Sequence, residues 1–201
     1  MRQFIHAPLR LLKQAALALL LTSLTSISWA ATSPQVQIVT SLGAITLELN
    51  ADKAPQTVAN FLKYVEDKHY DGTIFHRVIK NFMIQGGGMT ANMAEKSTRA
   101  PIKNEANNGL KNERGTIAMA RTQAPHSATS QFFINTVNND MLDYPGMDGW
   151  GYCVFGKVIA GMDVVDKIRA VSTKTVGPYE NVPQEPVVIK SMQVLPAPPA
   201  K

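Results

Sequence analysis

The sequence predicts a mainly β protein, a barrel or sandwich of short strands with two helices packed on it. Several short segments alternate apolar and polar residues, which is typical of half-buried strands. Two other segments repeat apolar residues at helical spacing. The 171 residues from Ala31 to Lys201 suffice for one well-buried core but not comfortably for two, so we expect a single domain over 31–195.

Residues 1–30 have the features of a cleaved signal peptide. Three basic residues precede an apolar run over 15–21, and no acidic residue occurs before Glu48. Ser28-Trp29-Ala30 then offers small residues at the two positions that a signal peptidase reads. Polar residues interrupt the apolar run well short of the roughly 20 residues that a spanning helix needs, which argues against a membrane anchor. We therefore expect cleavage after Ala30 and export from the cytoplasm.

The charge balance argues against a nucleic-acid-binding protein. The whole chain has 20 basic and 15 acidic residues, a formal charge of +5. Removing the three basic residues of the leader leaves 17 basic against 15 acidic residues, which is ordinary for a soluble protein. Cys153 is the only cysteine, so no intramolecular disulfide can form, and its apolar neighbours Val154 and Phe155 indicate a buried thiol.

The domain is expected to begin with a β-hairpin and a helix. Residues 36–40 and 44–49 alternate apolar and polar side chains on either side of Ser41-Leu42-Gly43, the pattern of a hairpin. Pro55 suits the first turn of a helix. Four apolar residues follow at helical spacing, which predicts one buried helix face: Val58, Phe61, Leu62 and Val65.

Short strands and one more helix are expected in the rest of the chain. The predicted strands cover 74–79, 116–121, 132–136, 152–159 and 187–195, the second helix covers 163–170, and a Pro-rich tail covers 196–201. The stretch 86–115 is rich in Asn, Lys and Gly, so we expect a loop. Within it, Gly86-Gly87-Gly88 indicates a tight turn that needs positive φ.

Common catalytic patterns are missing from the sequence. His69, His76 and His126 do not have metal-ligand spacing with other ligand types, so we expect no metal. There is no Gly-x-Ser-x-Gly motif, and no Lys-Ser/Thr pair follows the glycine triplet to complete a phosphate loop. The distinctive segments are instead apolar and rich in amides, so we expect no cofactor either.

Three blocks of sequence resemble the cyclophilin family of peptidyl-prolyl cis/trans isomerases, and they occur in the family's order. The blocks are Phe75–Gly88, Gly115–Ala120 and Ser130–Ile134. The likeness runs from about Gln35 to Leu195 and is greatest to the bacterial periplasmic branch. It implies an eight-stranded antiparallel β-barrel capped by two α-helices. It also implies an isomerase of proline-containing polypeptides that acts on folding or exported proteins in the periplasm.

Isomerisation of an X-Pro bond places clear demands on a site. Amide resonance opposes rotation with a barrier of about 18–20 kcal/mol, but no bond is made or broken. The site must therefore bind the twisted bond better than either planar isomer. The resemblance assigns Arg77 as the catalytic cation that favours the uncoupled nitrogen lone pair. It assigns the binding of the proline ring to an apolar cup of Phe82, Met83, Phe133 and Leu142, with Met141 and Tyr152 at its rim. It assigns the binding of the neighbouring peptide to the side-chain amides of Gln85 and Gln131 and to the main chain of Ala120 and Arg121.

Several alternatives stay open at this point. Phe132 and Phe133 are neighbours in a predicted strand and must face opposite sides, and only the resemblance selects Phe133 for the pocket. His76 is interpreted as structural, because the reaction transfers no proton. Two other classes of function stay open: a peptide-binding chaperone with weak isomerase activity, and a secreted hydrolase using His76 or His126. Met141 stands where many eukaryotic cyclophilins have tryptophan, so weak cyclosporin binding is expected. Nothing suggests more than a monomer.

Overall fold

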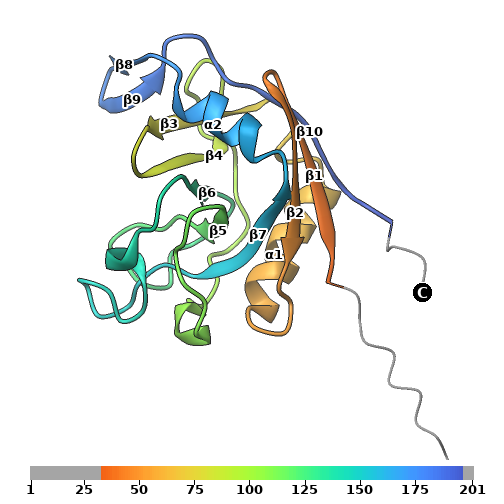
Figure 1. Ribbon diagram of the computed structural model, residues 1–201, viewed down its shortest axis with the longest axis vertical. Coiled ribbons are helices and arrows are strands. Elements are labelled where there is room, and N and C mark those ends of the chain that lie inside the picture. The colour runs from red at the N-terminus through yellow and green to blue at the C-terminus, as the bar shows by residue number, and fades with distance from the viewer. Residues whose placement is uncertain (1–32, 197–201) are drawn as a thin grey trace, which may run out of the picture. The chain divides into compact units, whose positions relative to one another are not determined.

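The computed structural model describes residues 33–196, so the predicted signal peptide and nearly all of the predicted tail lie outside the described residues. Eight strands form one antiparallel sheet in the order β10-β1-β2-β7-β5-β6-β4-β3 (Figure 1). Their bounds are β1 Gln35–Thr40, β2 Gly43–Leu49, β3 Thr73–Ile79, β4 Met83–Thr90, β5 Thr116–Met119, β6 Phe132–Asn135, β7 Val154–Ala160 and β10 Ile189–Val194. No helix within 33–196 is both long and apolar enough to cross a membrane.

The two edge strands of the sheet approach each other and nearly close a barrel. Ile74 of β3 forms an antiparallel bridge with Val188, just before β10. The amide of Phe75 donates to the carbonyl of Val187 at 3.0 Å, and the amide of Gly72 donates to Ile189 at 2.9 Å. These bonds satisfy part of what would otherwise be an open sheet edge. The predicted mainly β barrel with two helices is confirmed.

Helix α1 (Pro55–Glu66) begins where Pro55 was expected to start it. Its first turn is capped from a distance, because Ala54 offers no side-chain acceptor. The Glu105 carboxylate accepts from the amide of Thr57 at 2.8 Å and from the amide of Gln56 at 3.2 Å. A carboxylate at this end also faces the positive end of the helix dipole. Helix α2 (Met162–Arg169) starts one residue before the predicted range, after Gly161 in the left-handed region.

The barrel interior is filled by aliphatic strand residues and an aromatic group. Phe61 of α1 lies 5.1 Å from Phe155, 5.3 Å from Tyr70 and 5.8 Å from Phe132. Edge-on and tilted pairs of this kind contribute about 0.5–1.5 kcal/mol each beyond the area that they bury. The Tyr70 hydroxyl is satisfied by the Ser130 carbonyl at 2.9 Å. The helix therefore fixes the inner surface of the strands that carry the site on their outer surface.

Two predictions about the middle of the domain were wrong, and one hairpin near its end was missed. The expected loop does not begin at Gly86, because β4 continues to Thr90, which pairs with Thr73 of β3. The positive φ expected of the glycine triplet occurs at Gly87, at +86°, beside a register shift in the strand pairing and not in a turn. A small hairpin of β8 (Thr173–Val176) and β9 (Tyr179–Pro183) was also missed.

Candidate active site

A second hydrophobic cluster lies on the outer face of the sheet, away from the barrel core. Direct strand pairing aligns one residue from each of five strands in a row, and paired residues point to the same face. The row is Arg77, Gln85, Phe133, Ala118 and Val154. Met83 joins three of these residues in the buried part of the cluster, and Ile79, Phe82, Leu110, Ala120, Leu142 and Tyr152 pack around it. We call this cluster the cup.

The alternation of β6 separates core from cup. Phe132 is completely buried and meets Phe61, Tyr70 and Phe75 edge-on inside the barrel. Phe133 points outward, is 4% exposed and packs edge-on against Tyr152 with ring centroids 5.8 Å apart. Two consecutive phenylalanines therefore serve different faces, as strand geometry requires.

Most of the apolar residues expected in the pocket meet in this cup, but Met141 does not. Leu142 enters from a short 3-10 helix, η2 (Asp140–Leu142), and its carbonyl accepts from the amide of Tyr152 at 2.8 Å. Met141, in the same 3-10 helix, is 58% exposed and lines a neighbouring hollow.

The side-chain amides of two glutamines lie beside the cup and are held by a hydrogen bond and close packing. Gln85 donates from Nε2 to Oε1 of Gln131 at 2.9 Å. The Gln131 carbonyl accepts from the amide of Ala120 at 2.9 Å. A Cβ at Gly88 would lie 2.4 Å from Cγ of Gln131, so glycine is needed there to leave room for the amide chain. Gln85 and Gln131 line two adjoining hollows, which together form a groove along the sheet.

Arg77 stands at one end of this groove with its charge available. It is half-buried in β3, and no hydrogen bond or ion pair to its guanidinium exists among residues 33–196. With strands about 4.8 Å apart, Arg77 lies two strands, or roughly 10 Å between Cα atoms, from Phe133. The hollow that it lines, with a volume of about 380 Å³, is closed on the far side by the β8–β9 hairpin, including Tyr179 and Glu180.

His76 is poorly suited to act as a general acid. Burial lowers the pKa of His76 to about 4, and the charge of Arg77 lowers it further, so His76 is neutral at pH 7. Its Nδ1 is buried without a hydrogen-bond partner among the described residues. His126 accepts at Nδ1 from the amide of Asn104 at 3.1 Å and packs against Trp150. Burial also raises the pKa of Cys153 to about 11, so this thiol is not a nucleophile near neutrality.

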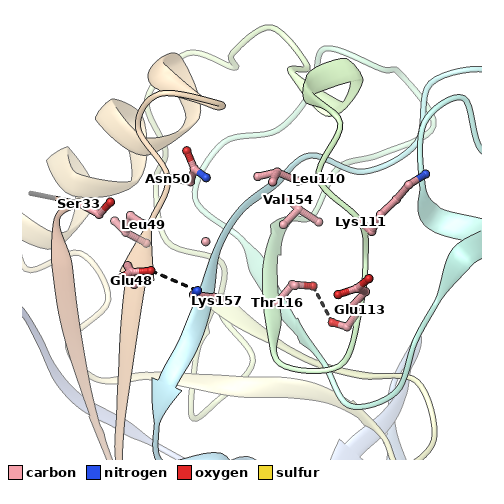
Figure 2. Close-up of a pocket in the computed structure, with 11 residues that line it drawn as sticks. Ser33, Glu48, Leu49, Asn50, Leu110, Lys111, Glu113, Thr116, Val154 and Lys157 are labelled. Carbon is pink, nitrogen blue, oxygen red and sulfur yellow. Dashed lines mark hydrogen bonds and ion pairs between the residues drawn. The ribbon is translucent and has the colours of Figure 1, made fainter. Parts of the chain in front are cut away.

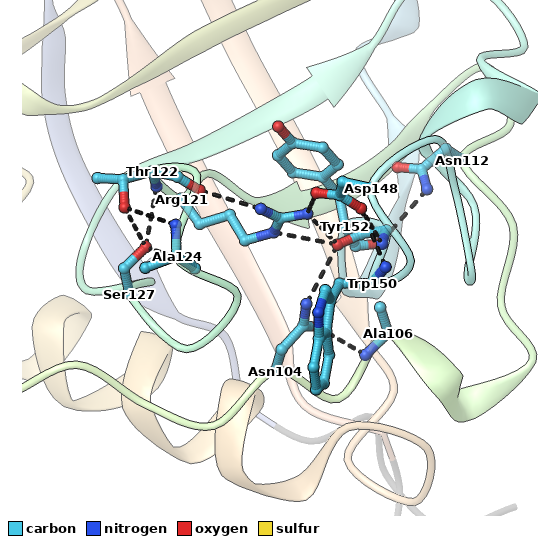
Figure 3. Close-up of polar contacts among 11 residues, drawn as sticks. Asn104, Ala106, Asn112, Arg121, Thr122, Ala124, Ser127, Asp148, Trp150 and Tyr152 are labelled. Carbon is cyan, nitrogen blue, oxygen red and sulfur yellow. Dashed lines mark hydrogen bonds and ion pairs between the residues drawn. The ribbon is translucent and has the colours of Figure 1, made fainter.

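Arg121 has a side-chain position that the sequence did not predict (Figure 3). Only 3% of its side chain is exposed, and its guanidinium donates to the carbonyl of Gly151 from Nε at 3.1 Å and from a terminal nitrogen at 2.9 Å. It also pairs with Asp148, whose pKa falls to about 2 because of that hydrogen bond. The same guanidinium lies 4.3 Å from the ring centroid of Tyr152. Arg121 therefore fixes one wall of the cup through Tyr152.

Asp148 and Asn104 complete this anchor and were missed. Asp148 Oδ1 accepts from the amides of Trp150 and Gly151, both at 3.0 Å, and Asn104 donates to the Gly151 carbonyl at 3.1 Å. The Asp-Gly-Trp-Gly sequence at 148–151 could have suggested such an aspartate turn.

Another hollow of about 260 Å³ lies beside β2, β7 and the chain leading into β5 (Figure 2). Glu48 and Lys157 on its wall pair with each other at 3.4 Å. Val154 and Leu110 are shared between this hollow and the cup cluster. Among the residues that the structure describes, no group of three or more His, Cys, Asp or Glu side chains could hold a metal ion. The arrangement on the outer face suits binding of an apolar ring beside a fixed cation and amides.

An antiparallel barrel with two helices and an apolar cup beside an arginine defines a class of peptide-binding isomerase. Residues 35–194 match the family described as cyclophilin type peptidyl-prolyl cis-trans isomerase/CLD. The chain belongs to this cyclophilin family and is a peptidyl-prolyl cis-trans isomerase. The predicted family, fold and enzyme activity are confirmed.

Relatives and solved structures agree with this assignment. The chain is 60% identical over 157 residues to peptidyl-prolyl cis-trans isomerase B of Escherichia coli K12, covering 77% of this chain and 96% of that protein. It is 52% identical over 186 residues to peptidyl-prolyl cis-trans isomerase A of Dickeya dadantii, covering 92% and 97%. A Cryptosporidium parvum cyclophilin-type isomerase crystallised in the presence of the dipeptide Ala-Pro is similar, with a TM-score of 0.67, 27% identity and coverage of 81% and 99%.

Proposed function

We propose that this isomerase accelerates X-Pro rotation without covalent chemistry, by holding the proline ring in the cup and stabilising the twisted amide with Arg77. As conjugation is lost, the proline nitrogen becomes pyramidal and gains a lone pair that can accept a hydrogen bond. A guanidinium placed in advance at that position stabilises the twisted state more than either planar isomer. The observation that supports this proposal best is Arg77, whose guanidinium has no partner among residues 33–196 and which shares a sheet face with Phe133.

The remaining groove residues would position the peptide on either side of the proline. Gln85 and Gln131 offer amides at a fixed separation of 2.9 Å, and the Ala120 and Arg121 backbone borders the same hollow. Met83, Phe82, Leu142 and Tyr152 would bound the ring together with Phe133. Neutral His76 would support Arg77 as a buried neighbour that adds no second positive charge at pH 7, because its pKa is lowered to about 4. Proline-containing polypeptides are the substrates, as the Ala-Pro dipeptide of the Cryptosporidium structure supports.

Replacement of Arg77 tests this mechanism. Arg77→Ala should lower kcat/KM by about 10²–10³, or roughly 3–4 kcal/mol of transition-state stabilisation. Its unfolding midpoint should stay close to that of the unmodified protein, because the guanidinium makes no bond within residues 33–196. Arg99→Ala is the matched control, because Arg99 pairs with Asp67 on the surface. Two-dimensional NMR exchange on a short Ala-Pro peptide measures the rate, and near-full activity of Arg77→Ala would exclude the mechanism.

A peptide-binding chaperone with weak isomerase activity is the second candidate, and the same exchange measurement separates the two. Turnover of a short peptide near 10³ per second would correspond to a gain of about 10⁵ over the unaided rate, or roughly 7 kcal/mol. Tight peptide binding with little gain in exchange would favour the chaperone. We further propose that the protein is a monomer and binds cyclosporin weakly.

We propose that the protein works in the periplasm after loss of residues 1–30. The basic start, short apolar run and Ser28-Trp29-Ala30 support this, as does the bacterial source of its relatives. The match to the Dickeya relative covers 92% of the chain, so it must extend into the first 30 residues. Expression in a Gram-negative host, fractionation and mass measurement would give a periplasmic protein beginning at Ala31. Recovery of the uncleaved chain from the cytoplasm would contradict the proposal.

A further inference from the structure

Exposed apolar side chains concentrate in one loop beside the cup. Among residues 33–196, seven large hydrophobic side chains are exposed, and four of them lie between 141 and 150. They are Met141, Tyr144, Met147 and Trp150, exposed by 58%, 48%, 89% and 43%. Single exposed apolar residues are ordinary, whereas a group of them marks an interaction site. We call residues 141–150 the apolar loop.

The apolar loop is firmly held, so its exposed side chains are presented in a defined arrangement. The buried guanidinium of Arg121 and the amide of Asn104 both donate to the carbonyl of Gly151 at its end. Asp148 accepts two amides within the loop, and Trp150 packs edge-on against His126 with centroids 5.0 Å apart. Polar groups of the loop thus take part in its own anchorage (Figure 3), while its exposed large side chains are apolar.

The apolar surface is continuous with the cup. The 3-10 helix η2 contributes Leu142 to the cup and Met141 to a hollow of about 600 Å³ that Tyr144 and Met147 also line. Tyr144 belongs as well to a second hollow, of about 240 Å³, together with Trp150. A polypeptide that leaves the cup past Leu142 therefore meets these side chains next.

We propose that the apolar loop is a docking surface for hydrophobic segments of the same unfolded polypeptide whose proline occupies the cup. The inference rests on the proposed placement of the cup. Methionine side chains are flexible and polarizable, so they fit segments of varied shape, and Tyr144 and Trp150 add larger flat surfaces. Lys111 at the edge pairs with Asp143 at 3.3 Å, and Glu113 and Asp140 leave this hollow with an excess of negative charge, so it disfavours acidic segments. The partner is an extended chain with leucine or phenylalanine several residues from the proline.

Peptide binding can be measured on the full chain carrying Trp29→Phe, which leaves Trp150 as the only tryptophan. Two 15-residue peptides have one central Ala-Pro, with either leucines or serines placed three to seven residues from it. We expect the leucine peptide to bind about tenfold more tightly, which equals about 1.4 kcal/mol, and to shift Trp150 fluorescence to shorter wavelength. Tyr144→Ser combined with Met147→Ser should abolish the preference. Leu42→Ser combined with Val194→Ser, a matched loss of exposed apolar groups elsewhere, should retain it.

Turnover of a short Ala-Ala-Pro-Ala peptide, which is too short to reach far along the loop, tests the cup separately. It should be unchanged in the Tyr144 and Met147 double variant, and Met147→Ser alone should weaken leucine-peptide binding about threefold. If the unmodified protein does not accelerate isomerisation of the short peptide, the proposed site is refuted. Equal affinity for the two long peptides, or a preference that survives the double variant, would overturn the docking surface. So would a dimer in sedimentation that Met147→Ser dissociates, since the occupant would then be a second copy.

Discussion

Arg121→Ala should weaken the protein and the cup together, because the buried guanidinium is the main anchor of residues 148–152. The substitution removes both hydrogen bonds to the Gly151 carbonyl, one to the Thr122 carbonyl at 3.0 Å, and the contact with the Tyr152 ring. The Gly151 carbonyl keeps one donor, Asn104, at 3.1 Å. Asp148 is 43% exposed and can be hydrated when its partner is lost. The damage is therefore confined to a small number of bonds.

The expected loss of stability follows from those bonds. Charged hydrogen bonds to a partly buried carbonyl contribute about 1.5–3 kcal/mol, and a cation over an aromatic ring about 1 kcal/mol. The pair with Asp148 adds at most about 1 kcal/mol, since solvent screens it. The sum is about 3–4 kcal/mol, which corresponds to a fall in Tm of about 6–16 °C for a domain of this size. Turnover should fall severalfold, because Tyr152 loses its support.

Urea unfolding followed by circular dichroism measures the loss, and peptide exchange measures the activity. Arg121→Lys should recover part of the stability, because an ammonium keeps the charge but cannot donate in a fork to one carbonyl. Asp148→Asn serves as the control for the exposed pair and should lose less than 1 kcal/mol. An Arg121→Ala protein within about 0.5 kcal/mol of the unmodified chain would show that this buried network does not stabilise the fold.

Three further outcomes are expected. Activity should be flat between about pH 6 and 8, because neutral His76 does not titrate there, and it should be insensitive to EDTA. The pKa of His76 is about 4 in the folded protein and 6.5 in the unfolded chain, so its contribution to folding stability is complete above pH 6.5 and falls by about 3 kcal/mol toward pH 4. The stability of His76→Gln should therefore fall less steeply with decreasing pH, as acid denaturation would measure. Phe133→Leu should lower kcat/KM about tenfold with little change in unfolding free energy, whereas Phe132→Leu should lose 1–2 kcal/mol of stability and keep its activity; equal profiles of the two variants would contradict the assignment of faces. Met141 lies outside the cup and is 58% exposed, so Met141→Trp should change turnover and cyclosporin inhibition by no more than severalfold; tightening of inhibition by about 30-fold or more would count against this placement.

Periodicity predicted the elements whose side chains face one core. The hairpin of β1 and β2 and the helix after Pro55 follow the sequence pattern closely, because their apolar residues all point into the barrel. Strand β4 did not, since Gly86 to Gly88 supply no side chains to alternate, and the strand is set by pairs with its neighbours at Gly86 and with β3 at Thr90. Strands β8 and β9 are short and largely exposed, so they carry little hydrophobic signal.

The candidate site could likewise be predicted only in part from the sequence. The cup residues share one sheet face, so their grouping could be anticipated once the strands and the family blocks were identified. The position of the Arg121 side chain could not, because it depends on where a loop 27 residues later places Asp148. Long-range contacts of this kind leave no periodic trace in the sequence. Glu105, which caps α1 from 48 residues away, was unpredictable for the same reason.

The cup is carried on the outer surface of a barrel wall that is one strand layer thick. Phe133 and Met83 are held from behind by the ladder between β4 and β6, and Phe132, on the opposite side of that ladder, is locked among aromatic rings. Closing the cup around a ligand by bending this wall would disturb the interior, so the wall resists deformation. The side chains of the cup therefore lose their conformational entropy during folding and not each time a peptide binds. Flexibility in the encounter belongs to the polypeptide, which bends to fit a surface that is already complete.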